Sequence, residues 1–295
     1  MATRITIDVF SGRKNPEVVL KGDQELELLN RLRPGRRLKR TESRPAPLSV
    51  LGYRGLLVEQ LGRPLRGLPR VFRVANGDLI GEGLGHRASD ENVEDFVCGS
   101  TGPFRPLGLG GRFSSWVLKE VDRYRDLRKR WPSRKVKWPR GNPCRCAPLY
   151  EPDWWNNDPT RLGCNNCYNY STDYRTDNFA QPGYASGVSH SLTCATVTPA
   201  AAADGLIDSP GANNHCPDEG HLVALVIAPG SDYHWYRKGR NGYWSHKPGN
   251  TPVTNLDNSG QLIPDPRTAD RGPYTIYCTF MVVMHGHIKI KGNYC

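Results

Sequence analysis

The sequence predicts an α+β protein with two domains. Short runs of alternating apolar and polar residues, such as Ile5–Phe10, are typical of β-strands. Residues 113–131 give the clearest helical pattern, because their apolar side chains recur at three- and four-residue steps. The 31 Gly and 24 Pro among 295 residues indicate many turns and long loops, which argues against a helical bundle. We expect one domain over residues 1–138 and a second over residues 139–295.

The first domain is expected to be a small α+β unit. An opening strand over Ile5–Phe10 leads to a helix over residues 23–32, which has an acidic N-cap and leucines at every third position. Further strands are predicted over residues 51–58 and 70–74, and a short helix ends near Phe96. We find no catalytic constellation in this domain, so we expect a structural, binding or regulatory role for it.

The helix over residues 113–131 and the linker that follows it are strongly basic. Lys and Arg side chains are interleaved with Trp131 and Trp138, so residues 119–140 form a candidate contact for nucleic acid or another polyanion. The net charge of +11 and the sequence pI near 9.3 favour the same class of partner. The alternative is a surface helix that docks by its apolar face and leaves its charges solvated.

The second domain is expected to contain an antiparallel sheet. We predict strands over residues 221–227, 232–237, 242–246, 274–283 and 285–291. Asn241 and Gly242 form a strong hairpin signal, and this hairpin places His234 and His246 near one another across a ladder. A long polar loop follows over residues 250–272.

The nine cysteines allow two chemical states of the protein. Either most of them pair as disulfides and at least one stays free, or a reduced chain uses some of them to bind a metal. A CxC pair and a CxxC pair have nearly the spacing of a four-thiolate zinc site. Its ligands would be Cys144, Cys146, Cys164 and Cys167. We expect the protein to have no cofactor. The alternative is a zinc ion bound by these four cysteines.

Cys167 lies where a polar loop is expected to enter a helix. The positive end of a helix dipole stabilises a thiolate, which lowers the pKa of the thiol and raises its reactivity. Downstream, His221 begins an apolar strand, where an imidazole can be held rigidly at a sheet edge facing that cysteine. His234 follows as a polar partner, so the order is cysteine, histidine, polar residue.

This order, together with the words CYNY, HWYR and WSHKPG, resembles the papain-like superfamily of cysteine hydrolases, especially its NlpC-type members. The resemblance covers Cys164 to about Trp244. It implies a helix bearing the nucleophile Cys167, packed on an antiparallel sheet that carries the base His221 and the orienting residue His234. The sequence departs from the pattern beside the nucleophile, where an Asn precedes the cysteine and a Tyr follows it.

A rival base is His246, for which Asn255 or Asp257 would be the orienting partner. A backbone N–H at the start of the Cys167 helix, with the side chain of Asn165 or Asn166, would stabilise an oxyanion. These positions complete the candidate catalytic site.

The leading hypothesis is a cysteine-dependent hydrolase, a peptidase or amidase, that transfers the acyl group of a peptide or amide substrate to Cys167. The alternative is a non-enzymatic basic binding protein whose cysteines are structural, as disulfides or a zinc site, and which contacts a polyanion. No run of about 18 apolar residues occurs, and the N-terminus lacks the apolar core of a signal peptide. The expectation is therefore a soluble, cytoplasmic protein, with unconventional secretion left open.

Overall fold

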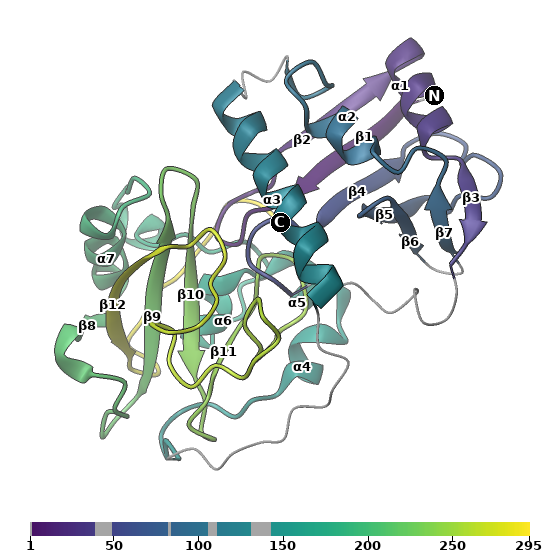
Figure 1. Cartoon of the computed structure of the whole chain (residues 1–295). Helices are drawn as coiled ribbons and strands as arrows, with labels where there is room; N and C mark the ends of the chain where they lie inside the picture. The colour runs from purple at the N-terminus through teal and green to yellow at the C-terminus, as the bar shows by residue number, and fades with distance from the viewer. Residues whose placement is uncertain (1, 39–48, 82–83, 106–110, 131–142) are drawn as a thin grey trace. The chain divides into compact units, whose positions relative to one another are not determined.

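The computed structural model describes residues 2–38, 49–81, 84–105, 111–130 and 143–295 (Figure 1). Its contacts divide the chain into two compact units. The N-terminal unit comprises Met1–Val9, Asn15–Leu48 and Tyr53–Arg130, and the C-terminal unit comprises Phe10–Lys14, Ser49–Gly52 and Trp131–Cys295. The predicted boundary between residues 138 and 139 lies outside the described residues. Two short segments that the sequence analysis placed in the first domain belong by their contacts to the C-terminal unit.

The N-terminal unit contains a seven-stranded antiparallel sheet in the order β2-β1-β4-β5-β6-β7-β3. The strands are β1 (Ala2–Asp8), β2 (Glu17–Lys21), β3 (Pro34–Arg37), β4 (Gly55–Gln60), β5 (Val71–Ala75), β6 (Asp78–Gly81) and β7 (Leu84–Ala88). The helices are α1 (Gly22–Arg31), α2 (Val93–Cys98) and α3 (Gly111–Arg130). The long amphipathic helix predicted over residues 113–131 is therefore present as α3. Its apolar positions Val117, Val121 and Tyr124 are buried.

The C-terminal unit contains a five-stranded antiparallel sheet in the order β11-β10-β9-β12-β8. The strands are β8 (Ile207–Asp208), β9 (His221–Ala228), β10 (Asp232–Lys238), β11 (Trp244–His246) and β12 (Ile276–Val283). The helices are α4 (Pro152–Asn156), α5 (Pro159–Cys164), α6 (Cys167–Thr172) and α7 (Cys194–Ala203), with short 3₁₀ turns η2 (Tyr184–Ser186) and η3 (Pro210–Ala212). The α+β class is confirmed. The predicted strand over residues 285–291 is wrong, because that segment has no strand structure.

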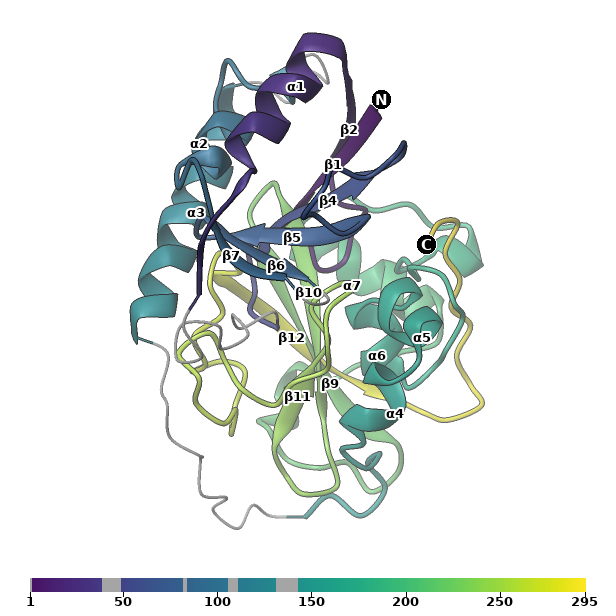
Figure 2. The same cartoon turned by 90° about the vertical axis from the view of Figure 1, so that its right-hand side faces the viewer.

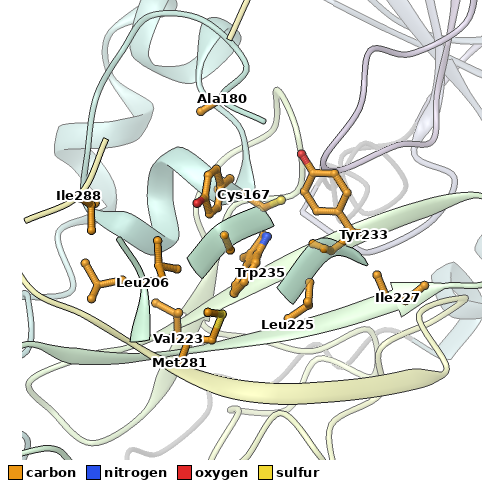
Figure 3. Packing of buried hydrophobic residues seen from close by; sticks show 14 residues of the cluster. Cys167, Ala180, Leu206, Val223, Leu225, Ile227, Tyr233, Trp235, Met281 and Ile288 are labelled. Atoms are coloured by element: carbon orange, nitrogen blue, oxygen red, sulfur yellow. The ribbon is translucent and has the colours of Figure 1, made fainter. Parts of the chain in front are cut away.

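The sheet of the C-terminal unit is covered on both faces. Figure 2 shows α5, α6 and α7 on one side and the long loop after β11 on the other. The helical side is filled by an apolar cluster that includes Cys167, Val223, Trp235 and Met281 (Figure 3). The opposite side is filled by a second cluster around Trp244. All eight residues of β9 are buried, as a central strand covered on both faces requires.

Three disulfides join distant parts of the C-terminal unit: Cys144–Cys216, Cys164–Cys295 and Cys194–Cys278. Their sequence separations of 72, 131 and 84 residues close long loops. Constraining loops of this length in the unfolded chain stabilises the fold by on the order of 4 kcal/mol each. Disulfides persist in oxidising compartments, so they argue against the cytoplasmic location expected from the sequence and favour the disulfide-bonded state of the two left open. No helix among the described residues is long and apolar enough to cross a membrane.

Candidate functional site

The loop before α6 positions Cys167 through a reciprocal cap made by two asparagines. The side-chain oxygen of Asn166 accepts from the backbone N–H groups of Tyr168 and Asn169, at 3.0 and 3.2 Å. In return, Asn169 Oδ1 accepts from the backbone N–H of Asn166 at 3.0 Å. This capping box satisfies N–H groups that would otherwise stabilise a thiolate at the helix start.

The two asparagines predicted to hold an oxyanion are committed to hydrogen bonds with neighbouring loops. Asn166 Nδ2 donates to the carbonyl oxygens of Gly12 and Ala180, at 3.1 and 2.9 Å. Asn165 Nδ2 donates to Arg161 O at 3.2 Å and to Asp177 Oδ1 at 3.1 Å. Both side chains are fully buried and act as connectors between loops.

Cys167 is fully buried, and its thiol is held in the neutral form. Burial and, after it, the nearby charge of Asp232 raise the pKa of this thiol to about 12, although hydrogen bonds with the Trp235 backbone and the Ser11 side chain oppose the rise. The expected lowering of the pKa by a helix N-terminus is therefore wrong. The loss of hydration outweighs the effect of a helix of only six residues.

A hydrogen-bonded chain runs from Cys167 through the interior of the C-terminal unit. The hydroxyl of Ser11 contacts the Cys167 thiol and lies 2.5 Å from His234 Nδ1. His234 Nε2 then lies 2.9 Å from His246 Nδ1. The chain ends where His246 Nε2 meets the carbonyl oxygen of Leu256 at 3.0 Å.

Only the last contact of this chain has a fixed direction. A carbonyl oxygen can only accept, so His246 Nε2 carries a proton and donates to Leu256. The other ring nitrogens contact each other and the Ser11 hydroxyl, and that hydroxyl also contacts the Cys167 thiol. Burial keeps this thiol protonated, so the arrangement contains no thiolate–imidazolium pair.

Asp232 holds the backbone of Ser11 and Gly12 in place. Its carboxylate accepts from the backbone N–H groups of Ser11 and Gly12, at 2.5 and 3.1 Å, and from the Tyr274 hydroxyl at 2.6 Å. Burial raises the pKa of this carboxyl, although these hydrogen bonds oppose the rise. Sequence reasoning gave Ser11 and Asp232 no role in the site. The turn residues around Ser11 carry no signal that they pack against β10.

His221 takes no part in the hydrogen-bonded chain. It lies at the start of β9, which pairs with β10 on one side and β12 on the other, so it is not at a sheet edge. Its Nε2 donates to the carbonyl oxygen of Ser171 at 2.8 Å, and its ring lies 5.3 Å from that of His285. Burial is the main cause that lowers the pKa of His221 to about 3.

The rival arrangement around His246 is also different from the one expected. The acceptor that orients this ring is the carbonyl of Leu256, which lies between the two predicted partners. Asp257 instead organises its own loop, accepting from the backbone N–H groups of Ser259 and Gln261, both at 2.9 Å. The Nδ2 atom of Asn255 is buried without a hydrogen-bond partner among the described residues.

The four-cysteine zinc site does not form. Cys144 and Cys164 pair with Cys216 and Cys295, which lie far away in the sequence, so two of the four ligands are already bonded. Of the other two, Cys146 is exposed and Cys167 is buried. Among the described residues, no group of three or more His, Cys, Asp or Glu side chains is arranged to hold a metal ion.

Comparison with known proteins gives one family relationship. No protein-family model matches the chain, and no solved structure matches it. Insoluble matrix shell protein 1 of Ruditapes philippinarum is 47% identical over 141 residues, which make up 47% of this chain and 91% of that protein.

The chain belongs to the family of insoluble matrix shell protein 1.

Membership in this shell matrix family overturns the hydrolase hypothesis. The relative is a shell matrix protein and not a peptidase or amidase. The buried, neutral thiol of Cys167 agrees with this correction, because acyl transfer requires a thiolate that a substrate carbonyl can reach. The cysteine–histidine chain lies in the buried core of the C-terminal unit.

The low pKa of His221 predicts how stability responds to acid. The folded-state pKa of about 3 lies below the ordinary value of 6.5, so the unfolded chain binds a proton that the folded chain refuses. The contribution of this residue to the free energy of unfolding is fully present above pH 6.5. It is lost as the pH falls from there toward about 3, by at most about 1.4 kcal/mol per pH unit. We expect His221→Gln to show a shallower loss than the wild type in urea unfolding at stepped pH.

The matched control is His215→Gln, because His215 is exposed on the same unit. This variant should keep the wild-type dependence on pH. Equal slopes for the wild type and His221→Gln would contradict the assignment of a buried neutral imidazole.

Proposed function

We propose that this protein is a non-enzymatic structural component of an insoluble extracellular matrix. The observation that carries the proposal is the 47% identity to insoluble matrix shell protein 1 over 91% of that relative. The three long-range disulfides support it, since such bonds are typical of proteins that work in oxidising, extracellular surroundings. A matrix protein must also keep its shape for long periods without turnover, and closed loops slow unfolding.

We also propose that the C-terminal unit keeps a papain-like arrangement without its chemistry. The support is local: α6 carries Cys167 at its first position and packs through its buried face on β10 of an antiparallel sheet. His234 and His246 follow in order on that sheet. In this proposal, positions suited to catalysis serve instead to join loops inside the core.

The partner we propose is a polyanion, but at a different place from the one expected. Within the described part of α3, cationic side chains pair with carboxylates: Arg125 lies 2.7 Å from Asp95, and Lys129 lies 3.4 Å from Asp126. These pairs compensate part of the positive charge of the helix. The remainder of the predicted contact, residues 131–140, lies outside the described residues.

A second set of cations lies on exposed positions of the N-terminal unit, and we call it the arginine surface. It consists of Arg33, Arg36, Arg37, Arg63, Arg66 and Arg70. Three of these flank or belong to the edge strand β3, and three belong to the loop between β4 and β5. The two segments meet where Gly67 approaches Pro34, since a Cβ on Gly67 would lie 3.8 Å from the Pro34 ring.

The chemistry of this surface favours an acidic polysaccharide. Guanidinium groups bind sulfate and carboxylate groups through paired hydrogen bonds, and a row of them follows a charged chain better than a single site does. Nucleic acid also carries regular negative charge, but the disulfides place the protein in compartments where nucleic acid is scarce. The arginines on β3 also discourage edge-to-edge pairing of sheets, which is compatible with binding.

The matrix role predicts where the native protein is found and in which redox state. In tissue that makes it, we expect the chain in the insoluble extracellular fraction, with the Cys164–Cys295 pair recovered as linked peptides by mass spectrometry. The exposed thiol of Cys146 serves as an internal control, because it should be found without an intramolecular partner. Recovery from the cytosol with Cys164 and Cys295 as free thiols would contradict the proposal.

The arginine surface predicts a salt-dependent interaction. We expect the triple variant Arg36→Gln, Arg37→Gln, Arg66→Gln to elute from a sulfated-polysaccharide column at clearly lower salt than the wild type, because fewer counterions are released on binding. A control with the same loss of charge is Arg123→Gln, Arg125→Gln, Lys129→Gln on α3, which should shift elution less. An equal shift for both variants, or tighter binding to DNA than to the polysaccharide, would contradict this assignment.

A further inference from the structure

A pocket of about 420 Å³ opens on the C-terminal unit. Its wall is made mostly by the loop over residues 181–192, and one side is completed by Arg13 from the Phe10–Lys14 segment. The residues that matter for binding are Arg13, Gln181, Tyr184, Val188, His190 and Leu192. Neither the matrix role nor the arginine surface makes use of this pocket.

The pocket loop is held in one shape by several independent contacts. Gly183 adopts a positive φ of 79°, and a Cβ there would lie 2.3 Å from the carbonyl oxygen of Val188. The backbone N–H of Val188 donates to Gly183 O at 2.8 Å, and that of Gly183 donates to the Asp204 carboxylate at 2.7 Å. The Cys194–Cys278 disulfide follows directly after the loop. A wall that is already ordered loses little entropy when a ligand binds.

Arg13 gives the pocket a positive charge. One of its nitrogens donates to the carbonyl oxygen of Ser231 at 2.7 Å, and its guanidinium lies 4.7 Å from the centre of the Phe10 ring. No carboxylate among the described residues forms an ion pair with it. The guanidinium is therefore positioned by neutral groups and keeps its charge for an anionic ligand.

His190 adds an imidazole to the same wall. Its Nδ1 lies 3.1 Å from the carbonyl oxygen of Ser191 and donates to it, which leaves Nε2 as the ring nitrogen for a ligand. Gln181 is engaged differently, because its side-chain oxygen accepts from Tyr233 at 2.9 Å and its nitrogen donates to Gly12 O at 2.8 Å. The ligand therefore meets one guanidinium and one imidazole nitrogen.

Two apolar side chains of the pocket are exposed to solvent. Tyr184 is 45% exposed and Val188 is 37% exposed, and both line the pocket. An aromatic ring beside aliphatic carbons suits the C–H face of a ring-shaped ligand more than an extended chain. Together these residues favour a ligand that is a compact ring bearing an anionic group and hydroxyl groups.

We propose that this pocket binds a single acidic sugar unit of a glycan. The anionic group pairs with Arg13, a ring hydroxyl donates to His190 Nε2, and the apolar face of the sugar lies on Tyr184. The proposal rests on the matrix role for its setting, and it names the part of the partner that one defined pocket recognises. An acidic peptide also offers a carboxylate, but it lacks the hydroxyl-bearing ring that the other two contacts require.

The test is titration calorimetry of the full chain with a glucuronate-containing disaccharide, the matching glucose disaccharide and free acetate. We expect the glucuronate compound to bind and each of the other two to bind at least about tenfold more weakly, since the glucose compound lacks the carboxylate and acetate lacks both the ring and its hydroxyl groups. Arg13→Gln should weaken binding of the glucuronate compound about tenfold or more, which is the effect of one charge-assisted hydrogen bond. Tyr184→Ala, at an exposed position that leaves the core intact, should also weaken it.

Two matched controls should bind like the wild type. Arg175→Gln removes an exposed arginine elsewhere on the same unit, and Trp154→Ala removes an aromatic ring with the same 45% exposure. Equal binding of the glucuronate and glucose compounds, or unchanged binding in both Arg13→Gln and Tyr184→Ala, would overturn the proposal. An acidic peptide that outcompetes the disaccharide would overturn it too. None of these results affects the recovery of the protein from the matrix, so failure of the pocket and failure of the matrix role are distinguishable.

Discussion

The buried contact between Ser11 and the edge of β10 is the interaction on which the C-terminal unit depends most. β10 pairs with β9 along Asp232–Arg237 but with β11 only from Tyr236 onward, so the first half of β10 has an open edge. The Phe10–Lys14 segment belongs to this unit, and its Ser11 and Gly12 backbones donate to Asp232. The segment is thereby anchored at the start of the half of β10 that β11 does not pair. The same segment connects the apolar cluster around Cys167 with the histidines on the other face.

The protonated, buried thiol of Cys167 explains why a cysteine and two histidines in this order present no reactive thiolate. His246 donates to the carbonyl of Leu256, and burial makes the charged form of the thiol costly. In the capping box, the side-chain oxygen of Asn166 accepts from backbone N–H groups at the start of α6. These N–H groups could otherwise have stabilised a thiolate. The three disulfides then hold the surrounding loops in place. Together these features hold the core of the C-terminal unit in one shape.

Local patterns in the sequence predicted the parts of the fold that local physics determines. The apolar spacing of residues 113–131 predicted α3, and the Asn241-Gly242 turn predicted that His234 and His246 lie close, which their 2.9 Å contact confirms. The contacts of the candidate site could not be predicted from local patterns, because the residues that make them are distant in sequence and belong to no recognisable motif. Ser11 belongs to a turn, and Leu256 contributes only a carbonyl. Disulfide pairing is also non-local, so the spacing of Cys144 and Cys164 suggested a zinc site that their actual partners exclude.

The central claim is that Cys167 is a sealed structural thiol and not a nucleophile. It is tested most directly by alkylating the folded protein without reductant and locating the modified cysteines by mass spectrometry, before and after denaturation. The account predicts that the exposed Cys146 reacts in the folded protein, whereas the buried Cys98 and Cys167 react only once the chain is unfolded. Modification of Cys167 in the folded protein at a rate comparable to that of Cys146 would contradict it.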